Sequence, residues 1–280
     1  MTDYLAQQVD IRDPHTVMAR DELSLWSARF GMLLLDHLKL EPLTAILDAG
    51  CGAGFPLFEL AQMFGDACQV TGVDVWEEAL DRARMKQQVY QVRNVRLLHA
   101  DAAALPLPDA TFDLITSNLG LNNFDQPELV LAECARVARP HARLMLTTNP
   151  MGTMREFYDS YRDVLTEHGN THAVEALARQ EAHRGTKESV CDLVRGAGFT
   201  IARVTEDQFQ LRYLDGSAFL RHFFIRLGFL SDWRGVIDAH DEAEIFGQVE
   251  DRLNQKARQD GELRMTIPML LVEAERNAAA

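Results

Sequence analysis

A glycine-rich turn carries the clearest chemistry in the chain. It spans residues 48–54 (DAGCGAG) and directly follows a strand-like run at 45–47. Glycines at such a turn let backbone N–H groups approach a ligand at the N-terminus of the following helix. A carboxylate at the start of the turn repels a phosphate and attracts an ammonium group. We therefore expect a ligand that is zwitterionic or cationic at this end, held by Asp48, Gly50, Cys51 and Gly52.

A dinucleotide is the main alternative ligand for this turn. Its fingerprint is G-x-G-x-x-G, with the third glycine packing the helix on the strand. Gly50 and Gly52 fit, but Phe55 takes the third position and the extra glycine is Gly54. This departure and the acidic Asp48 disfavour a pyrophosphate. Taken alone, the segment is also compatible with a tight turn that binds nothing.

An acidic residue, Asp74, ends the next apolar run. A carboxylate at the end of the second strand of a nucleotide-binding unit is placed to accept hydrogen bonds from ribose hydroxyls. Aspartate is also a favoured N-cap, and a helical pattern begins at Trp76, so helix capping is the alternative. Together with the glycine turn, Asp74 is better explained as a ribose contact than as a helix cap. We expect the neighbouring Val75 to line the same ligand site.

Two further positions follow strand-like runs. Asp101 and Ala102 come after the run at 96–100, where a carboxylate and a backbone N–H could recognise an adenine edge. Asn118 and Leu119 end the fourth run. In an open α/β sheet, ligands bind at the carboxyl ends of strands, where the strand order reverses. We therefore expect both pairs at one ligand site.

The elements that must position these residues alternate between short apolar runs and helical stretches. This alternation predicts a parallel sheet with right-handed crossovers. We expect strands at 45–49, 69–75, 95–100, 112–117, 143–148, 199–204 and 265–274, with a further short strand at 209–214. We expect helices at 55–64, 76–90, 128–137 and 189–196, an aromatic-rich helical stretch at 217–230 and an acidic helix at 241–258.

The chain is predicted to form one main domain with appendages. Residues 1–40 have apolar side chains at helical spacing and form a helical arm or cap. Residues 41–280 form the ligand-binding domain. Within it, the polar, helical segments 150–185 and 207–264 are insertions of a length that often marks a lid.

Four segments taken together resemble the class I S-adenosylmethionine-dependent methyltransferases. They are ILDAGCGAG, VTGVDV, HADAAALPLPDATFD and ITSNLGL, and the resemblance is to the small-molecule branch that includes the ubiquinone and menaquinone biosynthesis type, the methyltransferase domain 11 type. It covers residues 40–150 well, and 186–205 with 265–275 more loosely. It implies a doubly wound, Rossmann-like α/β sheet of seven strands in the order 3-2-1-4-5-7-6, with the seventh strand antiparallel.

The resemblance also implies a cofactor and its contacts. S-adenosyl-L-methionine is the methyl donor and S-adenosylhomocysteine the product. Gly50 and Gly52 line the methionine part and Asp74 holds the ribose. Asp101 and Ala102 contact the adenine, and the backbone at Asn118 faces the sulfonium.

Composition narrows the class of partner. The 28 basic and 42 acidic residues give a net charge of −14, which disfavours nucleic acid and anionic membranes. Methylases of exocyclic base nitrogens show Asn/Asp-Pro-Pro-aromatic where this chain has SNLG at 117–120. No run approaches the roughly 18 apolar residues of a membrane span, and the N-terminus lacks the pattern of a signal peptide. Four separated cysteines predict neither a disulfide framework nor a metal site, so we expect a cytoplasmic protein.

The methyl acceptor is much less defined than the donor. We expect a small, apolar or aromatic molecule, with Trp26, Phe219, Phe223 and Arg226 as candidate contacts. A general base is required only if the acceptor must lose a proton. His222 is a weak candidate for that base, and the catalytic residues are otherwise unknown. Core packing is the alternative role for the aromatic positions, whose spacing also suits a core-facing helix, and the segment could equally bury a homodimer contact.

Two other functions remain open. One is a carboxyl methyltransferase acting on a malonyl thioester of a carrier protein, because residues 117–119 (SNL) resemble a segment of that class. An acidic carrier would need a basic face, for which the chain offers Arg195, Arg203, Arg212, Arg221 and Arg226. The other is an assembly factor with the methyltransferase fold that binds the nucleotide without turnover.

Overall fold

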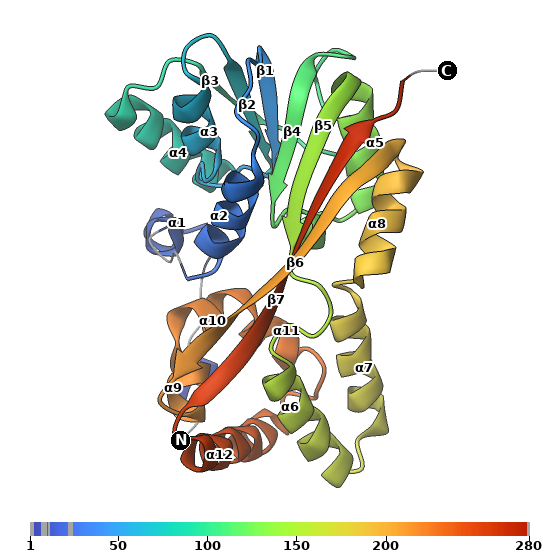
Figure 1. Ribbon diagram of the computed structural model, residues 1–280. Helices are drawn as coiled ribbons and strands as arrows, with labels where there is room; N and C mark the ends of the chain where they lie inside the picture. Colours follow the sequence, from blue (N-terminus) through green and yellow to red (C-terminus); the bar gives the residue numbers. More distant parts are fainter. Residues whose placement is uncertain (1–2, 7–9, 11, 22–24, 279–280) are drawn as a thin grey trace. The chain divides into compact units, whose positions relative to one another are not determined.

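Seven strands form one mixed sheet in the computed structural model, which describes residues 3–6, 10, 12–21 and 25–278. The strand order is β3-β2-β1-β4-β5-β7-β6 (Figure 1). Neighbours from β3 to β5 pair in parallel, and β7 pairs antiparallel to β5. The predicted fold class, strand order and antiparallel seventh strand are confirmed. The strands are β1 (Ala45–Ala49), β2 (Gln69–Asp74), β3 (Val95–His99), β4 (Phe112–Asn118), β5 (Ala138–Thr148), β6 (Phe199–Tyr213) and β7 (Leu263–Arg276).

Helices cover both faces of the parallel part of the sheet, so its strands are buried. Side chains alternate along β1: Leu47 and Ala49 pack with α5 (Pro127–Val137) and α8 (Lys187–Gly196) in one apolar cluster. Ile46 and Asp48 therefore point to the opposite face, which α2 (Ser27–His37), α3 (Leu57–Phe64) and α4 (Glu77–Tyr90) cover (Figure 1). The alternation thus places the carboxylate of Asp48 in the same layer as the helices that follow the glycine turn.

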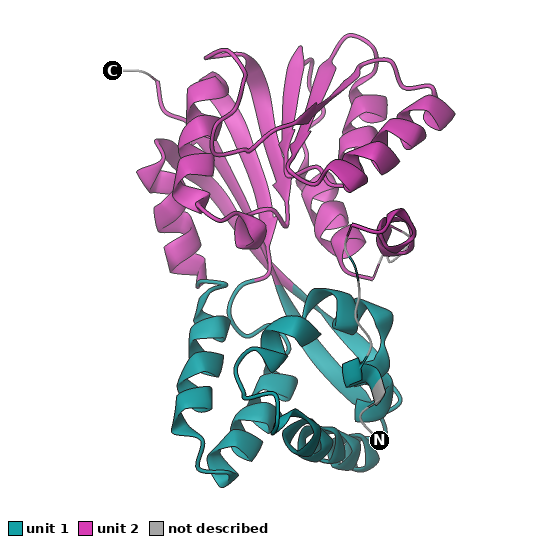
Figure 2. Ribbon diagram, turned by 180° about the vertical axis from the view of Figure 1, so that it is seen from behind, with its two compact units in different colours: residues 1–11, 150–185, 208–268 teal, residues 12–149, 186–207, 269–280 magenta. Residues whose placement is uncertain are grey.

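The chain divides into two compact units (Figure 2). Unit 2 holds residues 12–149, 186–207 and 269–280, including α1 (Pro14–Asp21) and the short η2 (Leu121–Asn123). Unit 1 holds residues 1–11, 150–185 and 208–268. Almost all of the two predicted insertions belongs to unit 1, and their action as a lid stays a prediction. The helices of unit 1 are η1 (Asp3–Ala6), α6 (Arg155–Glu167), α7 (Thr171–Ala182), α9 (Gly216–Arg221), α10 (Phe223–Gly228), α11 (Leu230–Arg234) and α12 (Glu242–Asp260).

Unit 1 has an aromatic core of its own. The Trp233 indole stacks on Phe157, with ring centroids 3.8 Å apart, and its Nε1 donates to the Tyr158 hydroxyl at 3.1 Å. The Tyr161 hydroxyl donates to the carbonyl of Trp233 at 2.9 Å. Buried indole N–H and phenol O–H groups need such partners, so these bonds let large amphipathic rings form a core. No helix of the described part of the chain has the length and apolar character of a membrane span.

Two strands are longer than the sequence pattern predicts. The runs at 199–204 and 209–214 are parts of one strand, β6, because its exposed polar middle still continues the ladder. Strand β5 begins at Ala138, before the predicted 143, although Pro140 and a positive φ of 65° at His141 interrupt its apolar pattern. Both extensions were missed because an apolar sequence pattern reports which strand residues are buried. Exposed strand residues can still pair with a neighbouring strand without contributing to that pattern.

The predicted helical stretch at 217–230 is broken. Helix α9 ends before His222, whose extended backbone (ψ 131°) starts the separate α10, and Phe229 separates α10 from α11. The Asp215 side chain caps α9, and the His222 side chain caps α10. The helical spacing that the sequence suggested for Phe219, Phe223 and Arg226 is therefore wrong, because Phe219 lies in a different helix from the other two.

Candidate functional site

The glycine turn is tied to the end of the neighbouring strand. The N–H groups of Gly50 and Cys51 both donate to the Val73 carbonyl, at 2.8 and 3.1 Å. Gly50, Gly52 and Gly54 have φ values of 77°, 50° and 100°, which disfavour any residue with a Cβ. A Cβ added at Gly52 would have no atom within 4 Å, so the backbone there borders open space. The turn is thus both fixed and approachable by a ligand.

Asp74 joins the turn to the second strand. One carboxylate oxygen accepts from the Gly52 N–H at 2.7 Å, and the other accepts from the Trp76 N–H at 2.8 Å. The second bond lies in the turn just before α4, whose N-cap is Trp76 without a side-chain cap, so Asp74 does not take the capping role that the sequence left open. The first bond holds the glycine turn against β2. Val75, the next residue, is 64% exposed, an unusual state for valine and one that suits contact with an apolar ligand group.

Asp48 is a buried carboxylate with one oxygen unused. It is 1% exposed, and its Oδ1 accepts from the Thr116 hydroxyl at 2.8 Å. Its Oδ2 has no hydrogen-bond partner among the described residues. Burial raises the pKa of Asp48 to about 7, the Thr116 hydrogen bond lowers it, and the charges of Asp74 and Glu59 raise it further. A ligand cation would stabilise the ionised form of this group.

Cys51, inside the turn, is equally inaccessible. It is 2% exposed, and burial with the charges of Asp48 and Asp74 raises the pKa of its thiol. Its Sγ would lie 2.8 Å from a Cβ built on Gly72 of β2. The thiol therefore packs the turn on the strand and has little nucleophilic character.

The predicted adenine side lies beyond β3. Asp101 is exposed and accepts the Ala103 N–H at 2.8 Å, while Ala102 is buried. His99, the last residue of β3, lies 3.0 Å from the Val75 carbonyl through Nε2 and 2.8 Å from Glu77 through Nδ1. It holds the loop that carries Val75. Nothing in the spacing of the sequence indicates this role, because the contacts depend on the β2–β3 register.

The side chain of Asn118 is already engaged. Its Nδ2 donates to the Ser27 carbonyl at 3.2 Å, and its Oδ1 accepts from the Thr147 hydroxyl at 2.7 Å. Leu119 has a positive φ of 64°, a conformation that costs a leucine free energy and is often found at functional sites. The side chain of Asn118 thus ties the start of α2 to the end of β4. The backbone of Leu119 is engaged as well, because its N–H donates to the Thr147 carbonyl at 3.0 Å and its carbonyl accepts from the Asn123 side chain at 2.6 Å. Trp26, directly before Ser27, is 9% exposed and its ring packs against Phe30.

A charged group on α1 and α4 supports the turn from outside. Asp21 pairs with Arg82 at 2.8 Å and with Lys86. Lys86 also donates to the Ala53 carbonyl, inside the glycine turn, at 3.0 Å. The sequence analysis missed these residues, since a lysine and an arginine on an amphipathic helix usually face solvent. They show that α1 and the turn are connected within unit 2.

The candidate acceptor residues of unit 1 differ in accessibility. Phe219 is completely buried and packs against Phe157 and Tyr213, as a core residue does. His222 is half-buried, and its Nδ1 accepts from the Phe224 N–H at 3.3 Å. Burial lowers its pKa, so the ring is neutral with its proton on Nε2. Phe223 and Arg226 are also half-buried, with the guanidinium 5.9 Å from the Phe223 ring centroid.

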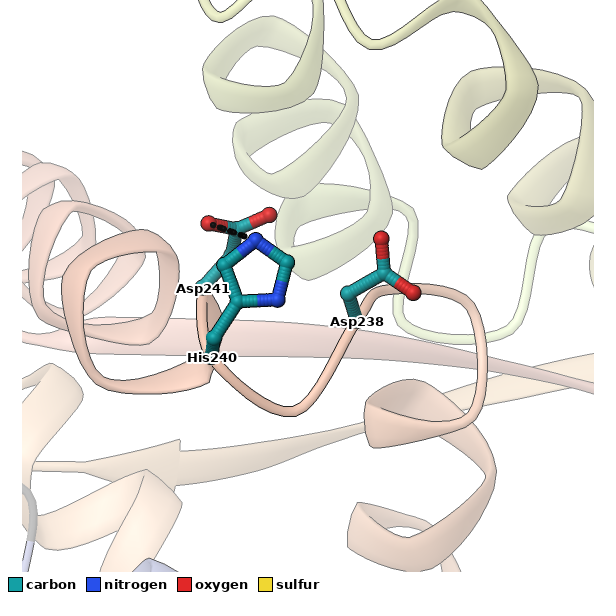
Figure 3. A group of neighbouring side chains, drawn as sticks. All are labelled: Asp238, His240 and Asp241. Atoms are coloured by element: carbon teal, nitrogen blue, oxygen red, sulfur yellow. Dashed lines mark ion pairs between the residues drawn. The ribbon is translucent and has the colours of Figure 1, made fainter.

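One group of side chains in the described residues could approach a metal ion. Asp238, His240 and Asp241 bring ligand atoms within 4.8 Å of one another (Figure 3). Asp238 and His240 are exposed, and His240 is already paired with Asp241 at 3.2 Å. Exposed acidic groups of this kind are common without an ion, and we assign no metal to them.

The domain that carries the turn matches a known family. The family described as methyltransferase domain aligns with residues 47–146, from β1 to β5. Residues 47–146 are therefore similar to a methyltransferase domain. The strand order and the position of the glycine turn agree with the expectations from the sequence.

Sequence relatives support the same assignment over a limited length. Demethylmenaquinone methyltransferases of Bacillus cereus and Bacillus anthracis are 32% identical over 124 residues, which is 44% of this chain and 52% of theirs. The chain therefore spans about half the length of these relatives.

Solved structures agree on the fold. An S-adenosylmethionine-dependent methyltransferase from Aquifex aeolicus has a TM-score of 0.53 and 25% identity, covering 69% of this chain and 92% of that one. The YcgJ protein from Bacillus subtilis has a TM-score of 0.60 and 18% identity, covering 90% of this chain and all of that one. At such an identity the second similarity concerns the fold alone.

Proposed function

We propose that this chain transfers a methyl group from S-adenosylmethionine to a small, apolar or aromatic acceptor. The observation that carries the proposal is the hydrogen bond between Asp74 and the Gly52 N–H, which joins a positive-φ glycine turn to a strand-end carboxylate. The Aquifex aeolicus protein is named for its dependence on S-adenosylmethionine. The Bacillus relatives are named for methylation of demethylmenaquinone, which suggests an apolar ring as the acceptor.

The residues of the turn suit this cofactor. The unpartnered Oδ2 of Asp48 can attract the ammonium group of the methionine part, to which the open backbone at Gly52 is also accessible. Asp74 has lone pairs left for ribose hydroxyls after its two backbone bonds, because a carboxylate accepts about four hydrogen bonds. The exposed Val75 and the carboxylate of Asp101 suit the face and the edge of an adenine.

The chain's own contribution to the reaction is then mainly positioning. When bound, the sulfonium supplies an activated methyl group for in-line displacement. Fixed turns, such as those at Gly50 and Leu119, restrict the geometry of approach, and alignment of reactants lowers the barrier most in such displacements. His222 is poorly suited as a base, since its Nδ1 already accepts a backbone N–H and its Nε2 carries the proton. Acceptors that need no deprotonation, or that ionise readily, fit best.

The carrier-protein alternative is weakened by ion pairing. Of the five arginines considered for a basic face, Arg195, Arg203, Arg212 and Arg221 pair with Asp192, Glu273, Glu262 and Glu250. Their charges are therefore compensated within the chain. Arg226 alone among the five has no carboxylate partner in the described residues, and a single arginine does not make a docking face for a protein.

Product formation separates turnover from binding. Purified protein should convert S-adenosylmethionine to S-adenosylhomocysteine with at least one member of a panel of hydroxylated aromatics and quinols, measured by mass spectrometry. Asp74→Ala should lose this activity, and Asp66→Ala, which removes an exposed carboxylate in the turn after α3, should keep it. Binding of the cofactor with no product across the panel would favour the assembly factor over the enzyme.

A further inference from the structure

Arg226 stands out among the cations of unit 1. Eight arginines of this unit pair with carboxylates: Arg155, Arg162, Arg179, Arg212, Arg221, Arg234, Arg252 and Arg264. Arg184 instead donates to the Tyr158 hydroxyl. Arg226 is half-buried, and its Nε is buried without a hydrogen-bond partner among the described residues. A desolvated guanidinium N–H with no acceptor is costly, which suggests that a ligand supplies one.

A second buried donor lies beside the same helix. The Tyr213 hydroxyl, at the end of β6, is also buried without a partner among the described residues. Burial raises the pKa of Tyr213 to about 12, so the hydroxyl keeps its proton at neutral pH. Its ring lies 5.5 Å from the ring of His222, centroid to centroid. The unsatisfied hydroxyl therefore belongs to a ring that lies beside the ring of His222.

His222 connects the two donors. The Arg226 N–H donates to the His222 carbonyl at 3.1 Å, so the two residues are one helical turn apart. The Nδ1 of His222 accepts the Phe224 N–H, which leaves Nε2–H as a third donor. Phe223, 5.9 Å from the guanidinium, adds an apolar ring. The group consists of donors and aromatic rings, and the nearest preceding carboxylate, Asp215, is used to cap α9.

We infer that Arg226, Tyr213 and His222 form a carboxylate-binding site in unit 1, for a ligand with a carboxylate on an apolar body. One guanidinium matches one negative charge, and the neutral hydroxyl and imidazole donors complete the hydrogen bonds of a carboxylate. The aromatic side chains suit the rest of such a ligand. This inference goes beyond the proposed function, and the binding of such a ligand can be measured separately from methyl transfer.

The test compares acids with their neutral amides. Dissociation constants of benzoate, 4-hydroxybenzoate and 3-phenylpropionate, and of the three matching amides, are measured on the full chain by saturation-transfer NMR. At least one acid should bind about tenfold tighter than its amide, as charge-assisted hydrogen bonds predict. Arg226→Ala should abolish this preference and Tyr213→Phe should reduce it. Arg258→Ala, which removes an exposed arginine of the same unit, should leave it unchanged.

Two further measurements make the outcome decisive. Arg226→Gln, which keeps a polar side chain but removes the charge, replaces Arg226→Ala if that variant melts early. Calorimetry with S-adenosylmethionine on each variant reports the donor site, whose affinity should not change. Equal binding of acids and amides, or a preference that survives loss of Arg226, would overturn the inference while the proposed function stands. Absence of cofactor binding by the wild type would instead refute the proposed function.

Discussion

The glycine-turn region of unit 2 and the aromatic region of unit 1 use polar groups differently. In the first, backbone N–H groups and carboxylates are fixed in short hydrogen bonds, as in the 2.7 Å contact of Gly52 with Asp74. In the second, large rings fill a core and most charged side chains are paired at its surface. Ligand binding in the first region depends on backbone geometry that many sequences share. Ligand binding in the second region depends on the few polar side chains that have no partner among the described residues.

The largest expected effect is on the stability of the aromatic core of unit 1 and concerns Phe219. Because this ring is 0% exposed in the core of unit 1, Phe219→Ala should lower the free energy of unfolding by about 3–5 kcal/mol. Urea denaturation followed by circular dichroism measures this loss. A variant of unchanged stability that fails only to bind acceptor would show that Phe219 lines a pocket.

A pH effect of intermediate size should appear in the donor region. Asp48 has a pKa of about 7 in the folded protein, raised from 3.8, and we expect it to meet the cofactor's ammonium in its ionised form. Affinity for S-adenosylmethionine should then fall about tenfold from pH 7.5 to pH 6, because binding must displace a proton. Asp48→Asn should bind more weakly and show a flat profile in calorimetry. A steep profile in this variant would assign the titration to another group.

The same residue should influence stability in the opposite sense. Its folded pKa lies above its unfolded value, so its contribution is fully present below pH 4 and is lost as the pH rises to about 7. The ligand-free wild type should therefore lose stability relative to Asp48→Asn over this interval. Thermal denaturation at pH 5 and pH 7.5 measures the difference. An identical change in both proteins would exclude Asp48 as its source.

The smallest effect concerns the adenine side. His99→Gln removes the contact with Glu77 and weakens the hold on the Val75 carbonyl. Because both contacts are partly exposed, cofactor affinity should fall only about two- to fivefold. His141→Gln, which removes a more exposed histidine–glutamate pair at Glu275, is the control and should have no effect.

The sequence was sufficient where local pattern and chain geometry determine the structure. The segment 45–54 and the strand-end Asp74 predicted the turn, and the resemblance carried by four segments, which include these residues, predicted the strand order and the methyltransferase domain. It was insufficient where contacts depend on register, as for His99 with Val75 and Lys86 with Ala53. It was also misleading at 217–230, where the helical spacing of the side chains predicted one helix and the structure has three. The breaks depend on side-chain caps such as that of His222, which the spacing of apolar residues does not reveal.

The most direct test of the central claim is calorimetry with S-adenosylmethionine and S-adenosylhomocysteine. The wild type and Asp66→Ala should bind both. Asp74→Ala should bind at least about a hundredfold more weakly, because it loses the ribose contacts and the anchor of the Gly52 N–H together. Equal binding by Asp74→Ala and the wild type, or no binding by the wild type, would contradict the account.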